Sequence, residues 1–159
     1  MRIIYTRPED GGLSFVSASP KERIEQILGP LTDDEYKQHV FSVSIPLNAI
    51  NPVEVDSTTI PSTMEFFDAW EQDVEPEKII INLTKALTVQ LSRLRDKREP
   101  LLQKYDGLLA RAQEIGSPEE IDRIKAIKQQ LRDITNPLKN LVPQSIEDII
   151  NATPSLDAY

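Results

Sequence analysis

Carboxylates are the side chains of this sequence that come closest to forming a chemical site. Between residues 65 and 77 there are six of them and no basic residue: Glu65, Asp68, Glu71, Asp73, Glu75 and Glu77. Several carboxylate oxygens could bind a divalent cation, but the D-x-[DN]-x-[DN]-G spacing of a calcium loop is missing. We therefore expect no metal site here. The run predicts a solvated acidic face, or a surface that docks on basic residues of a partner or of the long helix described below.

Other nucleophiles and metal ligands are scarce. The chain has no cysteine and one histidine, His39. Disulfide frameworks, zinc ribbons and thiol nucleophiles are thereby excluded, and Ser/His/Asp triads are disfavoured. We predict His39 to be a surface or capping residue, and Gly11 with Gly12 to form a hairpin turn. An enzyme such as a carboxylate-based hydrolase would need a pocket with converging acids, so we expect no enzymatic activity and no cofactor.

Composition limits the partners. The chain has 159 residues, with 18 Lys plus Arg against 26 Asp plus Glu and a net charge of −8. An acidic balance argues against binding to a phosphate backbone, so we expect no nucleic-acid partner. No apolar stretch approaches the ~18 residues of a membrane span, and the first residues do not fit a signal peptide. We expect synthesis in the cytoplasm, no membrane association, and one domain or a small domain with an appendage.

Residues 1–61 predict a small α+β region. A β-hairpin is expected over residues 3–18, and capping signals at Ser19 and Thr32 begin two short helices. Residues 41–61 are rich in β-formers and interrupted by prolines, which predicts short or edge strands. Residues 62–82 form a predicted connector. There, Ser62 with Glu65 begins a short helix over 62–73, and residues 78–82 predict a brief strand before Asn82 caps the next helix.

Residues 83–135 predict an antiparallel helical hairpin. The first helix runs from about Leu83 to Ile115, Gly116 ends it, and Ser117 with Pro118 begins the second. Apolar residues at heptad spacing predict a seam typical of a coiled coil. That seam comprises Leu91, Leu94, Arg98, Leu101, Tyr105, Leu108, Ala112 and Ile115. Residues 136–159 form a predicted tail with one short helix after Ser145. The expected fold class is therefore α+β, a small β-rich region with short helices followed by the hairpin.

The two helices of the hairpin differ in length, which leaves part of the longer one uncovered. Its proximal stripe, Leu83, Leu87, Leu91 and Leu94, must pack against the N-terminal region, the aromatic segment or another copy of the chain. Arg98 on the seam either fixes register or oligomeric state, or reaches solvent. The aromatic residues Phe66, Phe67 and Trp70 are either core or an exposed binding hot spot. These eight residues are the candidate partner interface.

Several segments resemble small proteins encoded in the structural gene regions of tailed bacteriophages and prophages. They are the start "MRIIYTRPEDGG", the connector "TTIPSTMEFFDAW", the helix entry "INLTKALTVQLSRLRDKREPLLQKYD" and the return "EIGSPEEIDRIKAIKQQLRDIT". The end "KQQLRDIT" is also similar to the end of tail-fibre assembly proteins. The sequence departs from this pattern over residues 41–56 and at Phe67.

This resemblance implies a non-enzymatic virion component of the tail, neck or fibre region. Such a protein would pack against other phage structural proteins and form homo-oligomers in a symmetric assembly. Two alternatives remain: an accessory factor for tail-fibre assembly, and a small binder that regulates a host protein.

Overall fold

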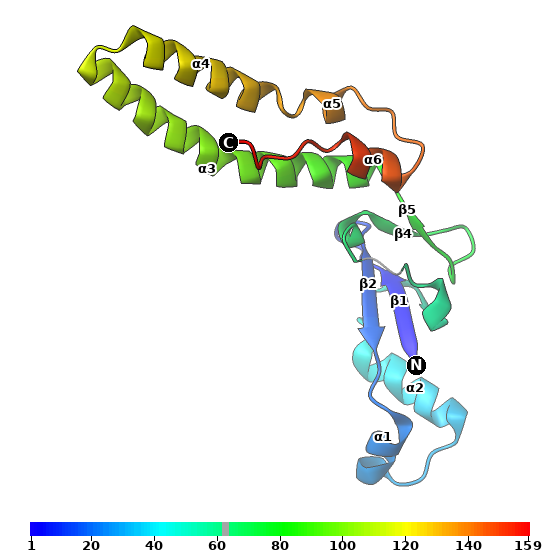
Figure 1. The fold of residues 1–159 in the computed structure, drawn as a ribbon. Coiled ribbons are helices and arrows are strands. Elements are labelled where there is room, and N and C mark those ends of the chain that lie inside the picture. The colour runs from blue at the N-terminus through cyan, green and yellow to red at the C-terminus, as the bar shows by residue number, and fades with distance from the viewer. Residues whose placement is uncertain (62–63) are drawn as a thin grey trace. The chain divides into compact units, whose positions relative to one another are not determined.

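A computed structural model describes residues 1–61 and 64–159 of the chain and divides it into two compact units, Met1–Asn82 and Leu83–Tyr159. The first unit holds both small antiparallel sheets and two short helices, and the second is helical (Figure 1). The α+β class predicted from the sequence is confirmed.

A three-stranded antiparallel sheet organises the first unit. Strands β1 (Arg2–Thr6), β2 (Leu13–Ser17) and β3 (Ile50–Glu54) lie in the order β2-β1-β3. The predicted hairpin between β1 and β2 is confirmed, with Ile4 opposite Phe15. In its turn, the Arg7 guanidinium binds the Asp10 carboxylate and also donates to the main-chain oxygen of Leu13 at 3.1 Å. The Arg7 side chain thereby occupies one main-chain carbonyl of β2, which is an edge strand of the sheet. This contact disfavours pairing of that end of β2 with another strand.

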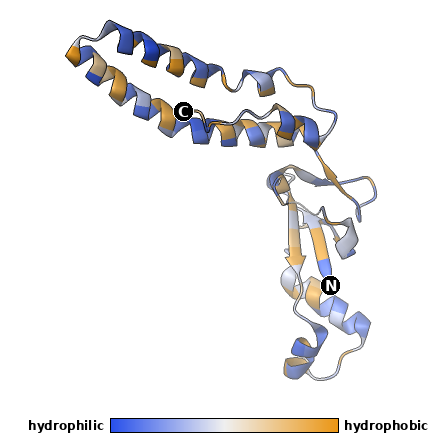
Figure 2. Ribbon diagram, viewed as in Figure 1, coloured by the Kyte–Doolittle hydropathy of each residue, from blue (hydrophilic) through white to orange (hydrophobic). Residues whose placement is uncertain are grey.

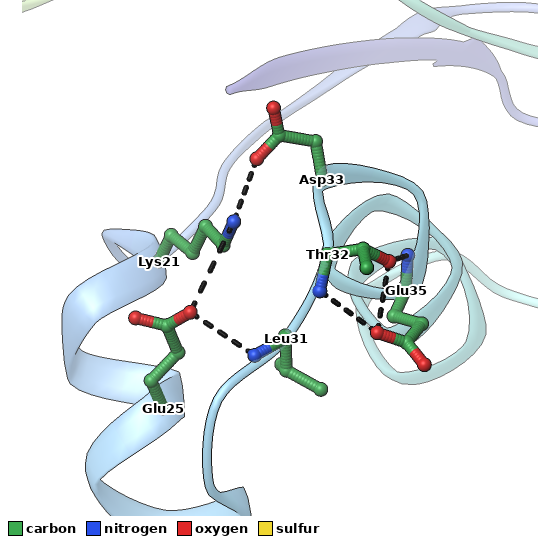
Figure 3. A network of polar contacts seen from close by, with 6 residues as sticks. All are labelled: Lys21, Glu25, Leu31, Thr32, Asp33 and Glu35. Carbon is green, nitrogen blue, oxygen red and sulfur yellow. Dashed lines mark hydrogen bonds and ion pairs between the residues drawn. The ribbon is translucent and has the colours of Figure 1, made fainter.

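Helices α1 (Lys21–Leu28) and α2 (Asp33–Ser44) are joined by a network of polar contacts (Figure 3). Lys21 lies 2.6 Å from a carboxylate oxygen of Asp33, and Glu25 accepts from the amide of Leu31 at 3.1 Å. The capping box at Thr32 and Glu35 is confirmed, with the Thr32 amide donating to Glu35 Oε2 at 2.8 Å. The predicted cap at Ser19 is wrong, because α1 begins after Pro20 without a side-chain cap.

Residues 41–44 are helical, so the strand predicted there is wrong. Phe41 continues the helical face of Tyr36 and Val40, and all three pack in the cluster that contains Ile3 of β1. Burial of this face against the sheet outweighs the β-propensity of the sequence "VFSVS". Strand β3 begins later, at Ile50.

The connector contains no α-helix in its described part. It has two short 3-10 helices, η1 (Ser57–Thr59) and η2 (Phe67–Ala69). Residues 62 and 63 lie outside the described residues, and so does the capping residue predicted at Ser62. Strands β4 (Trp70–Gln72) and β5 (Ile79–Ile81) follow and pair antiparallel. The helix predicted over residues 62–73 is therefore wrong in its described part, whereas the strand predicted at 78–82 is confirmed.

The second unit is a helical hairpin with a C-terminal extension. It consists of α3 (Leu83–Ile115), α4 (Pro118–Asp133), α5 (Asn136–Lys139) and α6 (Ile146–Ala152). Gly116 ends α3 at φ 72°, and the amides of Gly116 and Ser117 donate to the Ala112 oxygen, as a helix-ending glycine allows. Ser117 precedes α4 without a side-chain cap, whereas the capping box of Ser145 and Asp148 is confirmed. Apolar residues recur along α3 between hydrophilic ones (Figure 2).

Candidate functional site

The aromatic candidates form interior packing of the first unit. Phe66 and Trp70 are 0% and 1% exposed, and Trp70 packs with Ile4, Leu13 and Val55. Phe67 is half-buried and meets Trp70 edge to face, with ring centroids 5.1 Å apart. A partner could not reach Phe66 or Trp70 in this fold, which corrects their assignment to a partner interface. The β4 strand places Trp70 in the core because alternate residues of a strand face the same side.

The acidic run is engaged locally. Glu75 pairs with Lys78 at 2.5 Å, and the side-chain amide of Asn82 donates to both carboxylate oxygens of Glu71, at 3.2 Å to Oε1 and 3.1 Å to Oε2. Over residues 1–61 and 64–159, no group of three or more acidic, histidine or cysteine side chains could hold a metal ion. His39 is half-buried in the middle of α2, where its main-chain oxygen accepts from Ser42.

One open pocket of the first unit contains two acids. It has a volume of about 510 Å³ and is lined by Met1, Arg2, Glu54, Val55, Asp56 and Ser57. Glu54 pairs with Lys37 at 2.8 Å. Asp56 accepts from the amide of Thr58 at 2.8 Å, and this hydrogen bond lowers the pKa of the Asp56 carboxyl. A carboxyl with a lowered pKa holds its proton weakly, so Asp56 is a poor general acid near neutral pH.

The proximal stripe of α3 is covered in part by the same chain. Leu94 is 3% exposed, and Leu83, Leu87 and Leu91 are half-buried. Helices α5 and α6 contact α3, and the Gln90 side-chain amide donates to Thr153 Oγ1 at 3.1 Å. The C-terminal extension was not among the sources of cover considered from the sequence. The same chain therefore supplies part of the cover, and Leu83, Leu87 and Leu91 keep part of their surface exposed.

Arg98 points toward the end of α4. Its Nη1 donates to the main-chain oxygen of Arg132 at 3.3 Å, so the guanidinium interacts with the last turn of that helix, where cations are stabilising. Its Nε is buried and has no hydrogen-bond partner in the described structure. Arg98 is half-buried, so its side chain does not lie wholly in solvent. That it fixes register or oligomeric state stays a prediction.

The hairpin core contains most of the predicted seam. Leu94 is buried, and Leu101, Tyr105 and Ala112 pack in the core cluster. Leu102 and Leu109, which are not seam positions, pack there as well. Of the predicted seam, Leu108 is 39% and Ile115 is 69% exposed, so these two positions are wrong as core. From α4, Ile124 and Leu131 complete the cluster, and Lys128 pairs with Asp106.

The C-terminal tail, Thr153–Tyr159, lies along the hairpin. It runs beside α3 (Figure 1), from Gln90, which binds Thr153, to Lys104 and Tyr105, which donate to the Tyr159 oxygen at 3.0 and 3.2 Å. Leu156 and Tyr159 pack against the cluster that joins α3 to α4. Ser155, Asp157 and Ala158 are exposed. We call the surface of α3 and α4 that receives Leu156 and Tyr159 the tail groove.

The sequence reasoning missed the tail groove. The segment "TPSLDAY" has only two large apolar residues, three positions apart, and no helical or strand periodicity. The one signal available was the presence of Leu156 and Tyr159 in an otherwise polar end. Their partners on α3 were assigned to the seam instead.

Comparisons with known proteins return no family: neither a protein-family model, a curated protein nor a solved structure matches this chain. Among the described residues, no helix has both the length and the apolar character needed to cross a bilayer. In the tail groove, a segment without helix or strand packs on α3 and α4 through Leu156 and Tyr159, and Lys104 donates to its main chain. It is therefore the candidate site for recognition of another polypeptide.

Proposed function

We propose that this protein is a non-enzymatic component of a bacteriophage virion, located in the tail, neck or fibre region and working through protein–protein packing. The observation that carries the proposal is the tail groove, in which two helices hold a segment without helix or strand through two apolar anchors and hydrogen bonds to the Tyr159 oxygen. A groove of this kind recognises peptide segments rather than small substrates. The resemblance of the sequence to phage structural-region proteins supplies the setting.

The partners under this proposal are other phage structural proteins and further copies of the chain in a symmetric assembly. Cyclic assemblies present the same surface of each subunit repeatedly, so a weak contact is multiplied by the number of copies. The net charge of −8 makes a nucleic-acid partner unfavourable, in agreement with a role in protein packing.

Quantitative mass spectrometry of purified virions tests this proposal. The phage that encodes the chain is grown, and particles are purified by density gradient. We expect the protein in the particles at a fixed copy number relative to the major tail proteins, in a multiple of three, six or twelve. Detection in the lysate but never in the particles would overturn the virion role and favour an accessory factor for tail-fibre assembly. Co-purification with a host protein instead would favour a regulatory binder.

A further inference from the structure

Two Asp–Gly pairs of this chain are places where an aspartate can isomerise without an enzyme. They are Asp10–Gly11 and Asp106–Gly107, and the sequence contains no Asn–Gly pair. In this reaction the main-chain nitrogen of the glycine attacks the side-chain carboxyl carbon of the aspartate. A glycine has no side chain to hinder the attack, and its main chain rotates freely. The surroundings of each pair then set how fast it reacts.

The reaction passes through a cyclic imide. A bond forms between the glycine nitrogen and the aspartate Cγ, the Cγ–OH bond breaks, and the amide proton leaves with that hydroxyl as water. Water then adds to one of the two carbonyl carbons of the ring. Addition at the main-chain carbon gives isoaspartate, in which Cγ lies in the main chain, and addition at Cγ restores aspartate. The acid form reacts faster than the carboxylate, because a carboxylate is a poor electrophile and has no hydroxyl to lose.

Asp106–Gly107 is protected by the helix around it. Both residues lie inside α3, and the Asp106 carboxylate pairs with Lys128. A nitrogen in the interior of a helix donates to the carbonyl four residues earlier, so the Gly107 nitrogen is held away from the Asp106 side chain. This pair therefore serves as an internal control.

Asp10–Gly11 lies in the turn between β1 and β2, outside any helix or strand. The Arg7 amide donates to the Gly12 oxygen at 2.8 Å, and the Gly11 amide donates to the Arg7 oxygen at 2.9 Å. The second bond engages the nitrogen that would attack Asp10. Gly11 has a φ of 67°, so the turn favours a glycine at this position. The Asp10 side chain is 52% exposed, and water therefore reaches it.

The Arg7 side chain holds the Asp10 carboxylate by two parallel hydrogen bonds. Nε donates to Oδ1 at 2.9 Å and Nη2 donates to Oδ2 at 2.8 Å. The Gly12 amide adds a third bond to Oδ1 at 2.9 Å, and Arg7 Nη1 is itself anchored on the Leu13 oxygen at 3.1 Å. A paired guanidinium fixes the orientation of a carboxylate and favours its ionised form. We call these contacts of Arg7 with Asp10 the Arg7 clamp.

Gly12 leaves the space in which the guanidinium lies. A Cβ added at Gly12 would collide with Arg7 Nη2 and would lie 3.1 Å from Asp10 Oδ1. Gly12 does not have a positive φ, so its main chain would accept another residue. The missing side chain at this position therefore serves the Arg7 clamp rather than the turn.

We propose that Asp10–Gly11 is the site of spontaneous isomerisation in this chain, and that the Arg7 clamp sets its rate by holding the Asp10 carboxylate ionised and fixed. The inference does not depend on the proposed function. Isoaspartate at position 10 would insert one carbon into the main chain of the turn and move the carboxylate relative to Arg7. Because the length of a hairpin turn fixes the register of its strands, this product would disturb the pairing of β1 with β2.

Mass spectrometry of aged protein tests the site. The full chain is incubated at about 37 °C and about pH 6 for several weeks, digested, and analysed by electron-transfer dissociation. Isoaspartate is located by fragments that break beside its extra main-chain carbon. A synthetic peptide of residues 4–15 gives the rate for the same sequence without the fold. We expect isoaspartate at position 10 to form about tenfold more slowly in the chain than in the peptide.

Two variants release the clamp in different ways. Arg7→Gln removes the guanidinium and should bring the rate to within about threefold of the peptide. Gly12→Ala keeps the guanidinium but displaces it from the carboxylate, and should raise the rate about fivefold over the wild-type chain. Lys21→Gln is the matched control, since it removes an ion pair between α1 and α2 instead. Its rate at position 10 should equal that of the wild-type chain.

Three results would overturn the inference. One is an equal rate at position 10 in the wild-type chain and in the peptide. Another is an unchanged rate in both Arg7→Gln and Gly12→Ala while the fluorescence of Trp70 shows the first unit folded. The third is more isoaspartate at position 106 than at position 10 in Arg7→Gln. If Arg7→Gln does not fold, Gly12→Ala decides alone, and an unchanged rate in that variant overturns the role of the clamp.

Discussion

Replacement of Leu131 by alanine tests which residues form the hairpin core. Leu131 is 0% exposed and packs with Tyr105, Ala112 and Ile124. Loss of a fully buried leucine side chain removes its transfer free energy and leaves a cavity, which together cost about 3 kcal/mol. With a urea dependence of about 1 kcal/mol per molar for a unit of this size, the unfolding midpoint should fall by about 3 M. Circular dichroism at 222 nm follows the helical unit.

Leu108→Ala is the matched control for this experiment. The same chemical change is made on α3, but Leu108 is 39% exposed and lies outside the core cluster. A partly exposed leucine already interacts with water in the folded state, so the expected cost is about 1 kcal/mol or less. Equal losses for the two variants, or a larger loss for Leu108→Ala, would refute the assignment of the core and restore the heptad seam predicted from the sequence.

Three further predictions concern two glycines of the hairpin, a buried hydroxyl and the carboxylates of the first unit. Gly107→Ala should stabilise the chain by about 0.5–1 kcal/mol, because Gly107 is inside α3 and a Cβ there would meet open space. Gly116→Ala should destabilise the chain by about 1 kcal/mol, because Gly116 has a φ of 72°. Urea unfolding of both variants measures the difference. Thr135→Val should raise the melting temperature, with about 1 kcal/mol of added stability, because the Thr135 hydroxyl is 0% exposed and has no hydrogen-bond partner in the described structure; a lower melting temperature would show that a water or another group satisfies it. Acid should destabilise the first unit, because hydrogen bonds from Thr32 lower the pKa of the Glu35 carboxyl and the Lys21 contact lowers the pKa of Asp33. A carboxyl with a lowered folded-state pKa stabilises the fold above its ordinary pKa and loses that contribution as the pH falls through the folded value. Urea unfolding followed by the fluorescence of Trp70, the only tryptophan, should therefore show a lower midpoint near pH 3 than near pH 7, and a smaller pH dependence for Glu35→Gln.

The elements with strong local signals could be predicted from the sequence. The helix Leu83–Ile115 has the predicted bounds, because a long periodic pattern and a glycine at its end act together. The capping boxes at Thr32 and Ser145 have the predicted reciprocal hydrogen bonds. The β1–β2 hairpin follows from its turn residues.

Elements whose structure depends on tertiary packing could not be predicted in this way. Residues 41–44 are β-formers that become helical because Tyr36, Val40 and Phe41 share one face against the sheet. Trp70 is in a strand because β5 pairs with it, with Ile81 opposite. In both places the structure is set by contacts outside the segment itself, so local propensity favoured the wrong element.

The seam on α3 could be predicted for most of its length. Leu101, Tyr105 and Ala112 pack in the core cluster, whereas Leu108 and Ile115 are exposed and Leu102 and Leu109 pack there as well. A line of residues seven apart drifts by about 20° per heptad on a straight helix, so neighbouring positions also come into contact with the second helix.

Tyr105 shows how much of this contact could be predicted. It lies on the predicted seam and packs in the core cluster, and its hydroxyl donates to the Tyr159 oxygen at 3.2 Å. The inward position of Tyr105 therefore followed from its spacing along α3. Its hydrogen-bond partner did not, because Tyr159 lies 54 residues away in a segment without helical or strand periodicity.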